Sequence, residues 1–105
     1  MLSPQEHRRL EQYIHDIDVD HLSRTFDALG EPNRCLMFRA LLKGNPVQVG
    51  DLARVIGISD ALASQHLKIL RNAGLITKQR DGKRVLYRVD DTNHLVGALR
   101  KAVET

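Results

Sequence analysis

The sequence contains one cysteine, no tryptophan and no apolar run long enough to cross a bilayer. The single cysteine, Cys35, cannot form an intrachain disulfide, and the first residues lack the basic and apolar segments of a signal peptide. Both absences favour a cytoplasmic protein. Aromatic residues make up only 4% of the chain, which disfavours nucleic-acid binding by stacking of bases on an aromatic platform.

The residue patterns that mark enzymes are also missing. The chain has no nucleophile beside a candidate base, no glycine-rich phosphate loop and no pair of carboxylates at a plausible cleft. The sequence therefore predicts a protein that is not an enzyme and that needs no cofactor.

Charge is distributed unevenly along the 105 residues, a length that suits one domain. The net charge is only +3, but residues 1–33 carry seven acidic and three basic side chains. Residues 64–89 reverse this balance, with seven basic side chains against Asp81 alone. Such a basic segment is typical of a protein that binds a polyanion, although charge alone fits a solvated face equally well.

Helix-start and helix-stop residues predict three helices in the first half of the chain. The first follows Ser3, with Glu6 completing a capping box, and the second is capped by Asp18 or Asp20. A third helix lies within residues 31–44. Apolar residues recur at helical spacing in the first helix at Leu10, Tyr13, Ile14 and Ile17, and those of the second helix form one stripe, Leu22, Phe26 and Leu29. The expected buried side of the third helix is Leu36, Met37, Ala40 and Leu41.

The next segment predicts two helices joined by a tight turn. A short helix over residues 49–55 is broken at Gly57, a residue that adopts positive φ without steric cost. Ser59 caps the following helix, which covers residues 60–72. This arrangement is typical of a helix-turn-helix. The residues expected to lie close together on the core side of its second helix are Leu62, His66, Ile69 and Leu70.

A β-hairpin and a last helix complete the predicted fold. Strands over residues 75–80 and 84–89 flank Asp81-Gly82, which is a strong hairpin signal. The last helix begins at about Thr92 and has Leu95, Val96, Leu99 and Val103 at helical spacing. The chain is therefore predicted to be mainly α-helical with five or six helices and one hairpin, in a single winged helix-turn-helix domain.

The polar side of the second helix of the motif fits the edges of DNA bases. Glutamine can bond adenine bidentately, and serine or alanine can approach a thymine methyl group closely. Basic side chains further along this helix would meet phosphates, and those at the hairpin tip would contact the backbone or the minor groove. The expected DNA-binding residues are Ser59, Ala61, Ser64, Gln65, Lys68, Arg71, Arg80, Lys83 and Arg84.

Several motifs together resemble the ArsR/SmtB family of bacterial winged-helix repressors. The resemblance covers about residues 22–100 and implies a helix-turn-helix over residues 47–73, whose recognition helix is 60–72, and a wing over 75–89. It further implies a homodimer that reads an inverted repeat in a promoter and usually represses. The motifs are Ala28-Leu29-Gly30-Glu31-Pro32-Asn33-Arg34, Asp51-Leu52-Ala53, Ile58-Ser59, Ser64-Gln65-His66-Leu67-Lys68-Ile69-Leu70, Ala73-Gly74-Leu75-Ile76 and Asp81-Gly82-Lys83-Arg84-Val85-Leu86-Tyr87.

Apolar residues of the terminal helices are expected to form the dimer interface. The resemblance places dimerisation in residues 1–30 and 92–104. These segments carry more apolar side chains than a 105-residue monomer can readily bury, which independently favours a two-fold dimer. The expected interface residues are Leu10, Ile14, Ile17, Leu95, Leu99 and Val103.

The two metal sites common in the resembled family are incomplete in this sequence. One uses a Cys-x-Cys pair, but the matching residues 46–51 contain no cysteine. The other uses an aspartate and a histidine near the start of the last helix and a partner-subunit histidine three turns later. His94 matches the first histidine, but Thr92 stands at the aspartate position, with Asp91 one residue away, and the second histidine position falls at about Thr105. Because such a site needs about four ligands, no metal site is predicted there.

Three alternatives remain open from the sequence. Histidines of the first segment, His7, His15 and His21, could meet His94 across a dimer and form a nitrogen/oxygen site for zinc or nickel, although solvated side chains explain them as well. The chain could also be a winged-helix module for protein–protein contacts, but such modules usually lose the basic wing. Binding of structured RNA is disfavoured because the A-form major groove is too narrow for a helix.

Overall fold

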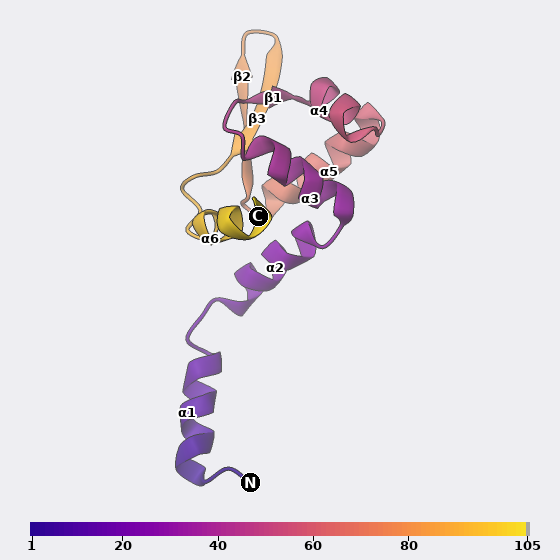
Figure 1. Ribbon diagram of the computed structural model, residues 1–105. Helices are drawn as coiled ribbons and strands as arrows, with labels where there is room; N and C mark the ends of the chain where they lie inside the picture. Colours follow the sequence, from indigo (N-terminus) through magenta and orange to yellow (C-terminus); the bar gives the residue numbers. More distant parts are fainter. Residues whose placement is uncertain (105) are drawn as a thin grey trace.

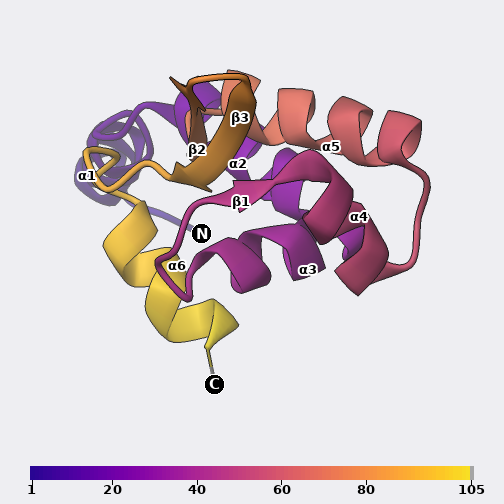
Figure 2. The same cartoon turned by 90° about the horizontal axis from the view of Figure 1, so that it is seen from above.

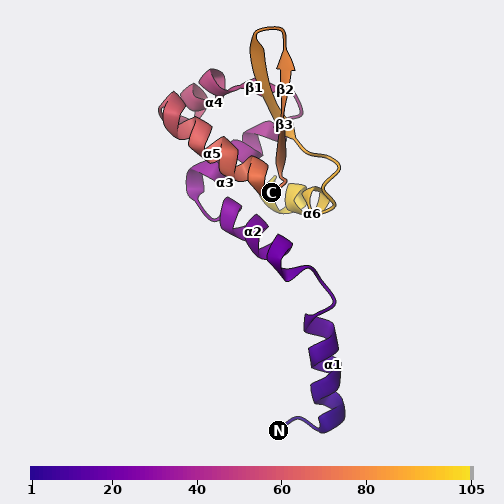
Figure 3. The ribbon, with the colours of Figure 1, turned by 180° about the vertical axis from the view of Figure 1, so that it is seen from behind.

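The computed structural model describes residues 1–104, and within them the chain forms six helices and a three-stranded sheet (Figures 1 and 3). This confirms the predicted fold class, a mainly helical domain with a β-hairpin before the last helix. The elements in chain order are α1 (Pro4–Ile14), α2 (Val19–Leu29), α3 (Pro32–Leu41), β1 (Val47–Gln48), α4 (Val49–Ile56), α5 (Asp60–Asn72), β2 (Ile76–Asp81), β3 (Arg84–Val89) and α6 (Val96–Val103).

The predicted caps of the helices are confirmed. The Glu6 backbone N–H donates to Ser3 Oγ at 3.1 Å, and the Ser3 N–H donates back to the Glu6 carboxylate at 3.0 Å. That return bond lowers the pKa of the Glu6 carboxyl, because it stabilises the charged form. Asp18 caps α2 by accepting from the His21 N–H at 3.1 Å. Each of these bonds satisfies a backbone donor that the first turn of a helix leaves unpaired.

The sheet contains one strand more than the predicted hairpin. Strand β3 lies between β2 and β1, and both pairings are antiparallel. The pairing of Asp81 with Arg84 places the two-residue turn at Gly82-Lys83, one position after the predicted Asp81-Gly82. Gly82 has φ of +63°, which a glycine adopts at little cost. Strand β1 has only two residues, too few for an alternating pattern, so its sequence carried no strand signal.

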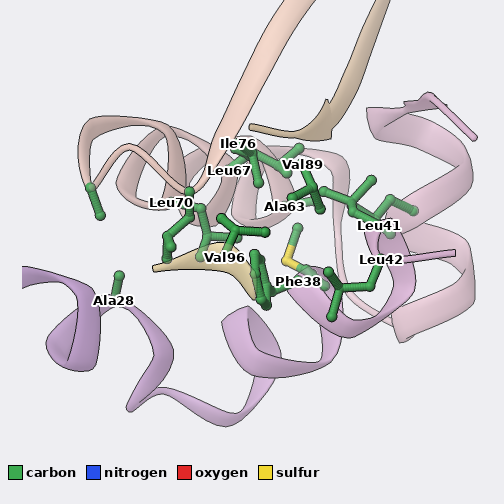
Figure 4. Close-up of a cluster of buried hydrophobic side chains, with 14 of the residues drawn as sticks. Ala28, Phe38, Leu41, Leu42, Ala63, Leu67, Leu70, Ile76, Val89 and Val96 are labelled. Carbon is green, nitrogen blue, oxygen red and sulfur yellow. The ribbon is translucent and has the colours of Figure 1, made fainter. Parts of the chain in front are cut away.

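The hydrophobic core lies where α3, α5, α6 and the base of the hairpin meet (Figure 4). Phe38 of α3 and Leu67 of α5 are fully buried at its centre, and Val96 of α6 closes one side. Helix α6 is tied to α3 by two arginines, since Arg39 donates to the Val103 carbonyl and Arg100 donates to the Leu42 carbonyl at 3.0 Å. The core residues are Ala28, Met37, Phe38, Leu41, Leu42, Leu52, Ala53, Ala63, Leu67, Leu70, Ala73, Leu75, Ile76, Val89 and Val96.

For some helices, the side that packs in the core is adjacent to the side that was predicted. Leu36, Leu62 and Ile69 are 50%, 38% and 40% exposed, although all three were expected on buried faces, and Phe26 of the apolar stripe of α2 is 60% exposed. Helices α3 and α5 have apolar side chains on more than one side, so periodicity alone does not select the side that packs. The residues that pack instead are Thr25 and Ala28 in α2, Phe38 in α3, and Ala63 and Leu67 in α5.

The last helix starts later than predicted. Residues 91–95 form turns, and α6 begins only at Val96. The side chains of Asp90 and Asn93 hold these turns, because Asp90 accepts from the Thr92 N–H and Asn93 accepts from the Leu95 N–H, each at 3.0 Å. Such side-chain bonds offer the backbone an alternative to the helix.

Helix α1 extends away from the rest of the molecule (Figures 1 and 3). The molecule measures 61 Å along its longest axis and 24 Å across, and no residue of α1 is buried. Viewed from above, α3, α4, α5, α6 and the sheet form a separate packed body (Figure 2). Over residues 1–104, no helix is both long and apolar enough to span a membrane.

Candidate nucleic-acid interface

Helices α4 and α5 form the predicted helix-turn-helix, with Gly57 at its corner. Gly57 has φ of +89° and ends α4 in the left-handed conformation, which confirms the reason for expecting glycine there. Ser59 then caps α5, since the Leu62 N–H donates to Ser59 Oγ at 3.1 Å. Buried Leu52 of α4 and Ala63 of α5 belong to the common core, so the two helices are held on one rigid support.

The outer side of α5 presents a row of exposed polar and small side chains. Ala61, Ser64, Gln65 and Lys68 are all exposed, on the side opposite buried Leu67. The side chains of Ser64, Gln65 and Lys68 make no hydrogen bond or ion pair within the described residues, so their donors and acceptors are available to another molecule. Ser59 also lies at the start of α5, where its hydroxyl oxygen accepts the cap hydrogen bond and its O–H remains able to donate.

The hairpin carries exposed basic side chains at its tip. Arg80, Lys83 and Arg84 are all exposed around the turn between β2 and β3. Arg84 donates to the carboxylate of Asp81 at 2.7 Å, so the negative charge of Asp81 offsets one of the three positive charges. The hairpin and α1 lie at opposite ends of the long axis, as Figures 1 and 3 show.

Two further basic residues lie outside this exposed row. Arg71 is half-buried near the end of α5, whereas Lys68, one turn earlier, is exposed. Arg54 of α4 is exposed and pairs with Asp51 at 2.6 Å, and it is not among the residues expected to bind DNA. Its position in the last turn of the first helix of the motif was the available signal.

The six residues expected at the dimer interface divide into two groups. Leu10 and Ile14 of α1 are 49% and 54% exposed, and Ile17, between α1 and α2, is 56% exposed; no residue of α1 is buried. Leu95, Leu99 and Val103 are all partly buried, and Leu99 and Val103 pack against the core of their own chain. The first group is thus free to contact a second molecule, whereas Leu99 and Val103 already pack within their own chain.

The histidines considered as metal ligands are only partly brought together. The rings of His21 and His94 lie 5.7 Å apart, although α2 and the turns before α6 are distant in sequence. His7 instead faces Glu11 on α1, with 3.1 Å between Nδ1 and the carboxylate. Over residues 1–104 no group of three or more histidine, cysteine or acidic side chains could hold a metal ion, and Thr105 lies outside the described range. Cys35 is half-buried.

Comparison with known proteins identifies the family. Residues 31–78 match the sequence model described as "Bacterial regulatory protein, arsR family". The chain is 37% identical over 82 residues to the HTH-type transcriptional regulator NmtR of Mycobacterium tuberculosis, covering 78% of this chain and 67% of NmtR. It is 37% identical over 76 residues to the HTH-type transcriptional regulator YgaV of Escherichia coli, covering 70% of this chain and 76% of YgaV.

A solved structure shows the same architecture. The winged helix-turn-helix DNA-binding domain Mb0332 of Mycobacterium bovis, described as homodimeric, superposes with a TM-score of 0.71 and 25% identity over 99% of this chain and 85% of that one. A family of DNA-binding regulators is consistent with the exposed polar row on α5 and the basic residues at the tip of the wing. The chain therefore belongs to the arsR family of bacterial regulatory proteins, and it is a DNA-binding transcriptional regulator rather than an enzyme.

Proposed function

We propose that this regulator is a repressor that binds an inverted-repeat operator as a homodimer, with α5 in the major groove. The observation that carries the proposal is the row of Ala61, Ser64, Gln65 and Lys68, which is exposed and unoccupied on a helix whose other side is locked in the core. A rigid helix with short polar side chains can approach base edges closely, and glutamine can read adenine.

The wing supplies contacts that do not depend on sequence. Arg80, Lys83 and Arg84 are exposed at its tip, where they can neutralise phosphates or enter the minor groove. Lys68, further along α5, can contact a phosphate flanking the bases that Gln65 reads. Base contacts from α5 set the sequence preference, and phosphate contacts from the wing set most of the salt-dependent affinity.

Homodimerisation through α1, α2 and α6 is supported by the exposed apolar side chains of the amino-terminal segment. Leu10, Ile14, Ile17 and Phe26 are about half exposed or more in the single chain. Exposed apolar groups on one stretch of a chain are typical of an interaction site. The homodimeric description of Mb0332 favours a second copy as the occupant. Two copies related by a two-fold axis would present two α5 helices, which accounts for an inverted repeat.

Selection of operators from random duplex DNA tests the proposal. The wild-type protein should enrich an inverted repeat with half-sites about one helical turn apart, and its affinity should fall steeply with salt. A promoter that contains the enriched repeat should be transcribed less when the protein is present. Absence of enrichment together with salt-independent binding would contradict DNA recognition and favour a protein–protein module. Increased transcription from that promoter would contradict the repressor role but not DNA binding.

A further inference from the structure

The buried face of α5 contains one titratable side chain, His66. It is 8% exposed, and the site described above does not use it. A buried imidazole needs partners for its ring nitrogens, because an unpaired polar atom in a core is costly. Those partners come from the junction between α2 and α3, on a different part of the chain.

Arg34 joins this imidazole to the end of α2. Its Nη1 lies 3.3 Å from His66 Nδ1, while its Nε donates to the Ala28 carbonyl at 2.7 Å and its Nη2 donates to the Asp27 carbonyl at 3.4 Å. Both carbonyls belong to the last turn of α2. An arginine can only donate, so Nδ1 of His66 accepts and the ring proton lies on Nε2. One guanidinium therefore connects α2 to α5.

Glu31 faces the opposite ring nitrogen. Its Oε2 lies 3.6 Å from His66 Nε2 and also accepts from the backbone N–H of Arg34 at 2.9 Å, which caps α3. That backbone hydrogen bond lowers the pKa of the Glu31 carboxyl, so the group is charged at neutral pH. The carboxylate thus holds the start of α3 and faces the imidazole with the same oxygen atom. The end of α2, the start of α3 and the middle of α5 meet at this cluster.

We infer that His66 is a positioning residue that couples α2 to the recognition helix and sets how Ser64 and Gln65 are presented to DNA. The inference rests on the proposed function, in which α5 reads bases and α2 lies in the dimer interface. His66 follows Gln65 directly, so a rotation of α5 that moves the imidazole also moves the glutamine. A displacement of α2 at the dimer interface reaches α5 through Arg34, because its guanidinium holds both the α2 carbonyls and the imidazole.

A matched pair of amide variants tests this coupling. His66→Asn places an amide oxygen near the position of Nδ1 and keeps an acceptor for Arg34. His66→Gln extends its amide toward the position of Nε2 and loses that acceptor. Both side chains are uncharged and polar, so the two variants differ mainly in whether the hydrogen bond to Arg34 or the contact with Glu31 is kept. The readouts are the ratio of affinities for the selected operator and for random DNA, the salt slope, and the backbone amide signals of Ser64, Gln65 and Ala28.

We expect His66→Gln to lower the operator-to-random ratio about fivefold to tenfold, which is the size of the net contribution of one typical hydrogen bond, with an unchanged salt slope. It should also shift the amide signals on both α5 and α2. His66→Asn should restore the ratio to within about twofold of wild type. Equal ratios and unshifted signals in both variants would overturn the inference.

A measurement on the wild-type protein keeps the test independent of how the variants fold. Two-bond proton–nitrogen spectra should show that the neutral form of the imidazole is the Nε2–H tautomer. An Nδ1–H tautomer would overturn the link through Arg34. If the wild-type protein shows no operator preference, the proposed function fails, whereas the amide signals and the tautomer still decide whether His66 couples α2 to α5.

Discussion

The amino-terminal arm, α1, and the body that follows differ in how their apolar side chains are used. No residue of α1 is buried, and Leu10 and Ile14 face solvent in the single chain. The body buries Phe38, Leu67 and Leu70 almost completely. The arm belongs to the acidic stretch of the chain and the wing to the basic stretch. The comparison indicates that the body folds around its own core, whereas the apolar side of the arm needs a second molecule.

The two phenylalanines extend this comparison to α2, which joins the arm to the body. Phe38 is 0% exposed in the body and Phe26 is 60% exposed on α2. Phe38→Ala should lower the free energy of unfolding by about 3–5 kcal/mol, because it leaves a cavity in the core. Phe26→Ala should cost clearly less at the same protein concentration. Chemical denaturation followed by circular dichroism measures both, and a loss below about 1 kcal/mol for Phe38→Ala would show that the core is placed wrongly.

Replacing apolar side chains of the arm by alanine should dissociate the dimer and leave the body folded. The double variant Leu10→Ala/Ile14→Ala removes four apolar side chains from a two-fold interface, and the dimer dissociation constant should rise about a hundredfold or more. Helix content should persist because alanine is a strong helix former. Sedimentation equilibrium measures the change, with Gln12→Ala on the same helix as the matched control. A wild-type protein that is monomeric at micromolar concentration would contradict the dimer itself.

In the body, the exposed glutamine of α5 should control sequence preference. Gln65→Ala should cost about 1–3 kcal/mol on the selected operator and much less on random DNA, since a base contact is lost and phosphate contacts are kept. Gel shifts on the two DNAs give the ratio, and Gln12→Ala on the arm should leave it unchanged. If Gln65→Ala keeps the ratio of the wild type, this residue does not read a base.

The charged pair at the wing tip should act on all sequences alike. Arg84→Ala should weaken binding to the operator and to random DNA equally and reduce the salt slope by about 1 per subunit. Asp81→Asn should have the opposite effect, because it releases Arg84 from the carboxylate 2.7 Å away and removes a negative charge near phosphates. Binding measured at several salt concentrations separates these changes from an effect on specificity. Tighter binding by Arg84→Ala would argue against a wing contact with DNA.

The smallest effect is expected from metal ions. Zinc or nickel at micromolar concentration should not change DNA affinity through the two sites common in the resembled family, because too few ligands remain to hold the ion tightly. Titration of the protein–operator complex tests this, with His94→Ala and His7→Ala/His15→Ala alongside. Metal-driven release that His94→Ala abolishes would disprove the prediction. Release abolished only by the double variant would reveal a different site on the arm.

Local signals explain why most of the secondary structure was predictable. Ser3, Asp18 and Ser59 bond to backbone donors within three residues, and Gly57 and Gly82 supply positive φ where the chain turns. These interactions involve neighbours in sequence and depend little on the rest of the fold. The order of helices, the helix-turn-helix and the hairpin could therefore be read from the residues alone, and so could the exposed polar row of α5.

Contacts between distant residues were decided only by the tertiary structure. Strand β1 exists because Val47 and Gln48 meet β3, and the ring of His21 lies near His94 because α2 lies against the turns before α6. The sequence also did not determine that Phe38 rather than Leu36 enters the core, since both residues are apolar and either of two adjacent faces of α3 could have packed. Periodicity names the candidates for burial, but the shape of the assembled neighbours selects among them.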